Sequence, residues 1–235
     1  MHGTTDREDW IRERLRAVHA RIDAAARACG RDPSEVRLLA VSKRVTAADV
    51  RVAQAAGQDS FGESYLNEAL PKITAIVDPG PEWHFIGPLQ SNKTRGIAEN
   101  FAWVHSVDRL KNAQRLNEQR PGYLPPLNVC LQVNISGESS KSGLRPDQLS
   151  QVAAAVAALP HLRLRGLMAI PAPSADIEVQ RAAFRQVRAA FELLNSQGLG
   201  LDTLSMGMSG DLEAAIAEGA TIVRVGTAIF GARGG

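Results

Sequence analysis

Leu38-Leu39-Ala40-Val41-Ser42-Lys43 is a short apolar run that ends on a lysine. Its length and bulk predict a buried strand. Partial burial at the end of such a strand disfavours the ammonium form of Lys43, lowers the pKa of its amine and makes a neutral nucleophile available. A neutral amine there suits Schiff-base formation with an aldehyde. By itself the stretch favours a lysine whose ammonium group reaches past the strand into water, so the residues around Lys43 decide between the two interpretations.

The composition is that of an ordinary globular protein. The 235 residues are 44% hydrophobic and 22% charged, and the net charge of +2 comes without a dense basic tract, which argues against a nucleic-acid partner. Cys29 and Cys130 match no metal or disulfide spacing, so we predict no metal site and a reducing, cytoplasmic setting. Residues 1–10 are too polar for a secretory signal, and no apolar run approaches the ~20 residues that span a bilayer, so we expect no membrane association.

Short apolar runs alternate with helical patterns along the chain. The predicted strands are 37–42, 60–63, 83–87, 103–107, 127–134, 162–170, 203–208 and 222–226. The predicted helices between and after them are 46–57, 65–77, 92–99, 108–119, 146–159, 176–197 and 210–218. This alternation predicts parallel βαβ units. Eight such units predict a single TIM-type (β/α)8 barrel, with a doubly wound open sheet as the alternative.

An extra helix is predicted before the first strand. Thr5-Asp6-Arg7-Glu8 has the form of a capping box, and Gly30 is a plausible stop. One apolar stripe follows the helical period, at Ile11, Leu15, Val18, Ile22 and Ala25. We therefore expect one domain over 1–235, with an N-terminal helix and lead-in over 1–36 and the barrel over 37–235. The helix is expected to cover an end of the barrel or to pack on its side.

In a barrel of this type, ligands bind at the carboxyl ends of the strands. Ser209-Gly210 and Gly226-Thr227 follow the last two predicted strands, where barrels often hold phosphate. Backbone N–H groups at a helix start, together with hydroxyl groups, make an anion site, and Gly226 allows close approach. The alternative is that both segments are ordinary helix caps.

Arg224 lies within the apolar run Ile222-Val223-Arg224-Val225, where a charge needs a partner. One possibility is that it donates to a cofactor ring nitrogen, and the other is that it pairs with a barrel carboxylate such as Glu63. His84 and His105 are interpreted as core or rim histidines rather than bases. Met206 and Met208 are best explained as packing residues.

Several segments together carry a resemblance that runs from Leu39 nearly to the C-terminus. They are Leu39-Ala40-Val41-Ser42-Lys43, Phe61-Gly62-Glu63, Trp83-His84-Phe85-Ile86-Gly87, Leu89-Gln90-Ser91-Asn92-Lys93, His105-Ser106-Val107-Asp108, Val133-Asn134, Lys141-Ser142-Gly143, Gly166-Leu167-Met168, Leu204 to Ser209 with Asp211, Val225-Gly226-Thr227 and Ile229-Phe230-Gly231. On these segments the chain resembles the pyridoxal-phosphate homeostasis proteins, which are related to the N-terminal barrel of alanine racemase.

The resemblance implies a single barrel that binds pyridoxal 5′-phosphate (PLP). It implies a Schiff base on Lys43, phosphate binding by Ser209, Gly226 and Thr227, and Arg224 facing the pyridine nitrogen. The full set of candidate cofactor-binding residues is Lys43, Ser64, Asn134, Met206, Ser209, Arg224, Gly226 and Thr227. Ser64 departs from the family, which usually has Asn after Phe-Gly-Glu, so a contact made by that Asn is in question here.

The resemblance also implies a function without significant turnover. Such a protein binds, stores or delivers PLP, keeps vitamin B6 and amino-acid pools balanced, and has PLP-dependent apoenzymes as candidate recipients. One alternative is an amino-acid racemase, which would need a second base from a separate β-domain of a partner subunit, whereas this sequence ends with its eighth strand. Another is a barrel enzyme that acts on a phosphorylated metabolite through Lys43. We expect a monomer.

Overall fold

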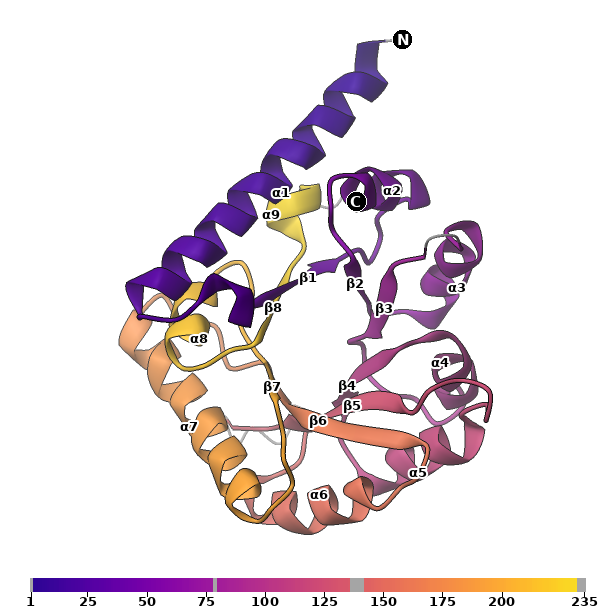
Figure 1. Ribbon diagram of the computed structural model, residues 1–235, viewed down its shortest axis with the longest axis vertical. Helices are drawn as coiled ribbons and strands as arrows, with labels where there is room; N and C mark the ends of the chain where they lie inside the picture. The colour runs from indigo at the N-terminus through magenta and orange to yellow at the C-terminus, as the bar shows by residue number, and fades with distance from the viewer. Residues whose placement is uncertain (1, 78–79, 136–141, 232–235) are drawn as a thin grey trace.

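The computed structural model describes residues 2–77, 80–135 and 142–231. Its eight strands form a closed parallel barrel in chain order (Figure 1). They are β1 (Arg37–Val41), β2 (Ser60–Glu63), β3 (Glu82–Phe85), β4 (Trp103–Val107), β5 (Leu127–Val133), β6 (Leu162–Ala169), β7 (Thr203–Ser205) and β8 (Ile222–Val225). The ring closes because β1 pairs in parallel with β8, from Arg37 opposite Ile222 to Ala40 opposite Val225. The barrel prediction is therefore confirmed, and the open sheet is wrong.

The helices lie outside the ring of strands (Figure 1). They are α1 (His2–Ala28), α2 (Ala47–Ala55), α3 (Leu66–Ala75), α4 (Thr94–Asn100), α5 (Leu110–Gln119), α6 (Leu149–Ala157), α7 (Ile177–Ser196), α8 (Leu212–Ala217) and α9 (Thr227–Phe230), with short 3-10 turns η1 (Pro33–Glu35) and η2 (Pro146–Gln148). None of the helices within the described ranges is both long and apolar enough to cross a bilayer. Lys141, which contributes to the resemblance, lies outside the described residues.

The helix α1 packs on the side of the barrel, which is one of the two predicted positions. It begins at His2, so Thr5 lies within the helix and the predicted capping box is wrong. Because only the four-residue α9 follows β8, this flank lacks a long helix of its own, and α1 covers it by packing along α2, α8 and α9 (Figure 1). The buried residues of α1 are Ile11, Leu15, Val18, Ile22 and Ala26, whereas the predicted Ala25 is only partly buried.

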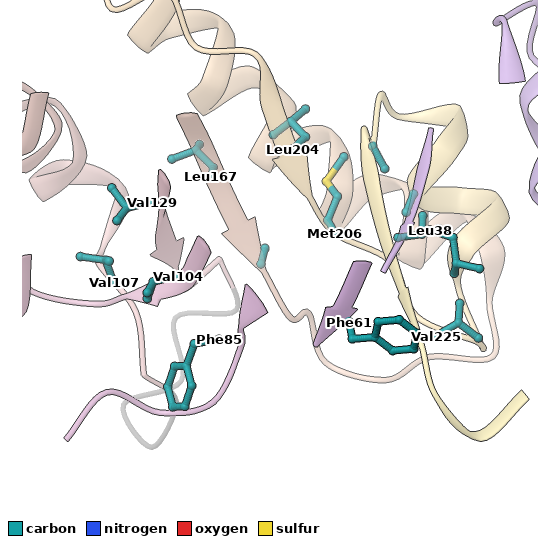
Figure 2. Packing of buried hydrophobic residues seen from close by; sticks show 14 of the residues in the cluster. Leu38, Phe61, Phe85, Val104, Val107, Val129, Leu167, Leu204, Met206 and Val225 are labelled. Carbon is teal, nitrogen blue, oxygen red and sulfur yellow. The ribbon is translucent and has the colours of Figure 1, made fainter. Parts of the chain in front are cut away.

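Alternate residues of each strand point to opposite faces of the barrel wall. One set forms the core between strands and helices, where Phe61, Val104, Leu204 and Val225 are among the labelled side chains of Figure 2. Each large side chain buried there stabilises the fold by roughly 1.5–3 kcal/mol relative to exposure. A second, smaller cluster of Trp103, Cys130 and Met168 is separate from this core. By strand parity, it belongs to the barrel interior.

The strand β7 is shorter than predicted, and this shapes the barrel mouth. It ends at Ser205 rather than near Met208. Gly207 has a φ of +93°, and a Cβ there would lie 2.5 Å from the Cβ of Ala215. Only glycine combines this backbone conformation with so close an approach to α8. The chain therefore turns sharply after β7, and Met206 and Met208 do not continue the in–out alternation of the strand.

Candidate functional site

A cavity of about 290 Å³ lies at the carboxyl ends of the strands. Its size is close to the lower end of the roughly 300–1,000 Å³ that small-molecule sites occupy. The residues that line it are Val41, Lys43, Ser64, Ile86, Ile170, Met208, Ser209, Gly210, Arg224, Gly226 and Thr227. Six of the eight predicted site residues are therefore brought together around one cavity, which we call the lysine cavity.

The other two predicted residues lie elsewhere. Asn134 lines an adjoining cavity of about 250 Å³, which shares only Ile86 and Ile170 with the lysine cavity. Met206 is fully buried in the hydrophobic core, where Figure 2 shows it near Leu204. The sharp turn at Gly207 brings Met208, rather than Met206, to the lysine cavity.

The backbone just before Lys43 is held from three sides. The Ser42 N–H donates to the Gly62 carbonyl at 2.9 Å. The Ser42 hydroxyl donates to Glu63 Oε1 at 2.6 Å. The Ser42 carbonyl accepts a hydrogen bond from Lys72 Nζ at 2.7 Å. Because every polar group of Ser42 is engaged, the residue that follows it, Lys43, leaves the strand in a fixed direction toward the cavity.

Lys72 and Glu63, which both hydrogen-bond to Ser42, also form a buried ion pair with each other. Lys72 Nζ lies 2.7 Å from Glu63 Oε1, and the side chains are 9% and 0% exposed. Burial raises the pKa of the Glu63 carboxyl, and the hydrogen bonds from Lys72 and Ser42 oppose this rise. Since the partner of Glu63 is Lys72, the predicted alternative in which Glu63 pairs with Arg224 is wrong.

Arg224 extends from β8 into the barrel and lines the lysine cavity while only 4% exposed. Its Nη1 donates to the Ser205 carbonyl at 2.6 Å and to the Ser205 hydroxyl at 2.8 Å, and its Nη2 donates to the Ala169 carbonyl at 3.0 Å. Burial lowers the pKa of Arg224 to about 10, against the opposing effect of Asp211. A guanidinium carries five N–H groups. The two remaining ones, on Nε and Nη2, form no hydrogen bond with the described residues.

The loops after β7 and β8 supply the polar groups on the other side of the cavity. Within the described residues, the backbone N–H groups of Ser209, Gly210, Gly226 and Thr227 donate no hydrogen bond. The loop after β8 lies close to β1, because a Cβ at Gly226 would be 3.0 Å from the Val41 carbonyl oxygen. These four backbone N–H groups, together with the hydroxyl groups of Ser209 and Thr227, provide the hydrogen-bond donors of an anion site.

The helix α1 supports the loop after β7 from outside. Arg21 Nη1 donates to the Ser209 carbonyl at 2.8 Å, and Arg21 also pairs with Glu213 through two hydrogen bonds, one of them 2.6 Å long. The hydrogen bond with Glu213 raises the pKa of Arg21. The Met208 N–H donates to Asp211 Oδ1 at 2.6 Å. Ser209 is thus oriented by residues on both of its flanks.

Sequence reasoning missed three residues that shape this site. Met208 was assigned to packing alone, and Ser205 and Lys72 were not considered. The alternation Thr203-Leu204-Ser205 contains a usable signal, because a serine at that spacing points into the barrel. Lys72 lies in the apolar stripe of α3, with Ala69, but nothing local identifies Glu63 as its partner. Among the described residues, no group of three His, Cys, Asp or Glu side chains could hold a metal ion.

The chain is similar to known proteins over nearly its whole length. The alanine racemase N-terminal domain family matches residues 14–234. A pyridoxal phosphate homeostasis protein of Pseudomonas aeruginosa is 66% identical over 223 residues, which cover 95% of this chain and 96% of the relative. The structure of PipY from Synechococcus elongatus with PLP bound is 38% identical, has a TM-score of 0.82, and is matched over 94% of this chain and 99% of that one.

The fold is also found in a more distant group. Alanine racemase from Corynebacterium glutamicum is 21% identical with a TM-score of 0.68, and the match covers 94% of this chain but 60% of the racemase. At that identity the likeness concerns the barrel alone. From the family match and the relative of high identity, the chain belongs to the pyridoxal phosphate homeostasis protein family, whose barrel is that of the alanine racemase N-terminal domain.

Proposed function

We propose that this protein binds PLP as a Schiff base on Lys43, holds it without significant turnover, and takes part in intracellular PLP (vitamin B6) and amino-acid homeostasis. One observation carries the proposal. Lys43, Arg224 and the hydroxyl-bearing loops after β7 and β8 all line a single cavity. A relative that covers nearly the same length was solved with PLP bound, which supports the choice of cofactor.

The donor set of the cavity fits the three polar parts of PLP. Lys43 would supply the amine for a Schiff base with the aldehyde, with release of the aldehyde oxygen as water. Ser209, Gly226 and Thr227 donate to the phosphate oxygens through hydroxyl and backbone N–H groups. Arg224 directs an N–H group at the pyridine nitrogen and keeps that nitrogen unprotonated. A ring with an unprotonated nitrogen is a weaker electron sink, which suits a protein that stores PLP better than one that uses PLP for catalysis.

The described wall of the lysine cavity offers no second acid–base group for racemisation. A racemase needs two acid–base groups on opposite faces of its substrate. Among the described residues that line the lysine cavity, Lys43 and Arg224 are the ionisable side chains, since no His, Cys, Tyr, Asp or Glu is present. Arg224, the other ionisable group, stays charged with a pKa of about 10. We therefore expect no rapid inversion of alanine, which a chiral assay measures directly.

The test is a spectrum of the purified full-length protein. We expect it to take up PLP, to absorb visible light, and to keep the cofactor through denaturation once borohydride has reduced the linkage. Peptide mapping by mass is expected to find the label on Lys43. Lys43→Ala is expected to fold and to lose the label, while the matched control Lys111→Ala, which removes an exposed lysine on α5, keeps it.

Three outcomes would contradict the proposal in different ways. A label on another lysine would remove Lys43 from its role. Vigorous inversion of alanine would favour the racemase. Colourless protein that fails to take up added PLP would favour an enzyme acting on a phosphorylated metabolite. As recipients we propose PLP-dependent apoenzymes, for which loaded protein should restore activity in a dialysed aminotransferase.

A further inference from the structure

A continuous row of hydrogen bonds runs through the barrel interior from the lysine cavity. Arg224 Nη1 lies 2.8 Å from Ser205 Oγ, and Ser205 Oγ lies 2.7 Å from His105 Nδ1. His105 Nε2 lies 2.8 Å from His84 Nδ1, and His84 Nε2 lies 2.9 Å from Glu82 Oε1. Glu82 is the first residue of β3, so the row ends at the opposite end of the barrel from the cavity.

The row crosses the barrel rather than following its wall. His105 is on β4 and Ser205 is on β7. Even by the shorter way around the ring, β5 and β6 lie between these two strands. A direct hydrogen bond between the two side chains therefore passes through the interior. Ser205, His105 and His84 are each 0% exposed. Water does not compete for these bonds, and in such surroundings hydrogen bonds in a series polarise one another.

The ring of His84 is further held by stacking. It lies nearly parallel to the ring of Trp103, at 4° with the centroids 5.3 Å apart. Arg165 in turn lies over the Trp103 ring, with 4.7 Å from its guanidinium carbon to the centroid. The imidazole plane is therefore fixed on its face as well as at both nitrogens.

Hydrogen-bond chemistry gives the row a single direction. The Glu82 carboxylate can only accept, so His84 Nε2–H donates to it. A neutral imidazole has one N–H, which leaves His84 Nδ1 to accept from His105 Nε2–H. His105 Nδ1 then accepts from the Ser205 hydroxyl, and the Ser205 oxygen accepts from Arg224. Burial lowers the pKa of both histidines, which keeps them in the neutral form that this assignment needs.

We propose that Ser205, His105 and His84 are positioning residues for Arg224. By drawing the Ser205 hydroxyl proton toward His105, the row turns a lone pair of Ser205 toward Arg224 and fixes the guanidinium so that its remaining N–H groups face the cofactor ring nitrogen. The inference rests on the proposed function, because it assigns the target of Arg224. It adds that the interaction of the ring nitrogen is set by side chains that never touch the cofactor.

The first test removes the link between the arginine and the histidines. Ser205→Ala deletes one buried hydroxyl, and Thr203→Val is its matched control on the same strand, since the Thr203 hydroxyl bonds to Asp202 outside the row. Each variant is titrated with PLP and with an analogue in which a C–H replaces the ring nitrogen. We expect Ser205→Ala to weaken PLP binding roughly 2- to 10-fold, the effect of one hydrogen bond, and to leave the affinity for the analogue unchanged. Thr203→Val should alter neither.

A second pair of variants tests the middle of the row. His105→Phe removes the acceptor for the Ser205 hydroxyl, whereas His105→Asn keeps an acceptor oxygen near the position of Nδ1. We expect His105→Phe to behave like Ser205→Ala, and His105→Asn to bind PLP within about 2-fold of the original protein. If His105→Phe does not fold, the titration of Ser205→Ala decides whether the row positions Arg224.

The outcomes separate this inference from the proposed function. Failure of the original protein to bind PLP would overturn the proposed function. Normal PLP binding that Ser205→Ala leaves unchanged, or that it weakens equally for PLP and the analogue, would overturn the positioning role alone. Equal loss for both ligands would show that Ser205 supports the cavity as a whole rather than the arginine.

Discussion

Two buried cations of this protein are treated in opposite ways. Lys72 lies outside the barrel wall, 2.7 Å from the carboxylate of Glu63. Arg224 lies inside, where the hydrogen bonds of its guanidinium go to the oxygens of Ser205 and Ala169, none of which carries a charge. The positive charge of Lys72 is therefore neutralised by Glu63, whereas the positive charge of Arg224 stays available to a ligand in the cavity. Arg224 also lines the lysine cavity, which distinguishes it from Lys72 and from Arg120, a buried arginine that donates only to backbone carbonyls outside that cavity.

Lys72 and Arg224 also differ in how the cost of burying their charges is compensated. Removing one member of a buried ion pair destabilises a protein because it leaves an uncompensated charge. Burial of Arg224 already disfavours its charged form, as the lowered pKa of about 10 shows. Arg224 combines this burial with a place in the wall of a cavity, and buried ionisable groups in cavities gather at functional sites.

The largest expected effect is on the structural cation. Lys72→Met leaves Glu63 buried beside Ser42, and we expect the free energy of unfolding to fall by about 3 kcal/mol, at the lower end of values for a broken buried pair because Glu63 can take up a proton. Urea unfolding at pH 7 measures this. The double variant Lys72→Met, Glu63→Gln removes both charges and should recover much of the loss. Equal stability of the single variant and the original protein would show that the pair is not structural.

The next effect concerns the phosphate loops. Ser209→Ala and Thr227→Val each remove a hydroxyl donor to an anion, and such hydrogen bonds contribute about 1.5–3 kcal/mol. We therefore expect the affinity for PLP to fall roughly 10- to 100-fold in each variant, with stability nearly unchanged. Titration with pyridoxal, which lacks the phosphate, is the control, because its weaker binding should not respond. A parallel loss for pyridoxal would place these hydroxyls somewhere other than at the phosphate.

A smaller effect is expected from the support that α1 gives to the loop after β7. Arg21→Ala removes the donor to the Ser209 carbonyl and the pair with Glu213. Since Arg21 is partly exposed, we expect a loss of about 1 kcal/mol in PLP binding, close to 5-fold. Arg16→Ala, an exposed position on the same helix, should have no effect. If both variants bind PLP equally, α1 covers the barrel without shaping its cavity.

The sequence predicted the parts of this protein that repeat and missed the specific side-chain pairs between different elements. Alternating apolar runs were sufficient for the eight strands, and strand ends such as Lys43 identified the mouth of the barrel. The ion pair of Lys72 joins α3 to β2, and the bond of Ser205 to His105 spans 100 residues. No local pattern specifies such pairs. For the two methionines the reason is different, because the left-handed conformation of Gly207 places Met208 at the lysine cavity and Met206 in the core.

The smallest effect tests the far end of the interior row through pH. Burial alone would raise the pKa of Glu82, but the hydrogen bond with His84 and the nearby Arg37 lower it to about 2 from an ordinary 4.5. A carboxyl whose folded pKa is depressed stabilises the fold above 4.5, and this contribution is lost as the pH falls toward 2. The two histidines act in the same direction at higher pH, because their lowered pKa values make protonation below about 6.5 favour the unfolded chain.

Glu82→Gln separates these two contributions. The amide oxygen can still accept from His84, so the row is kept while the ionisable group is removed. We expect the loss of stability between about pH 6.5 and 4.5 to remain in this variant and the further loss below 4.5 to become shallower, as measured by urea unfolding at a series of pH values. Because Glu82 is about a third exposed, the difference should be smaller than that of any variant above. Identical acid profiles for the two proteins would mean that the pKa of Glu82 is the same in the folded and the unfolded chain, which would contradict its stabilisation by His84 and Arg37.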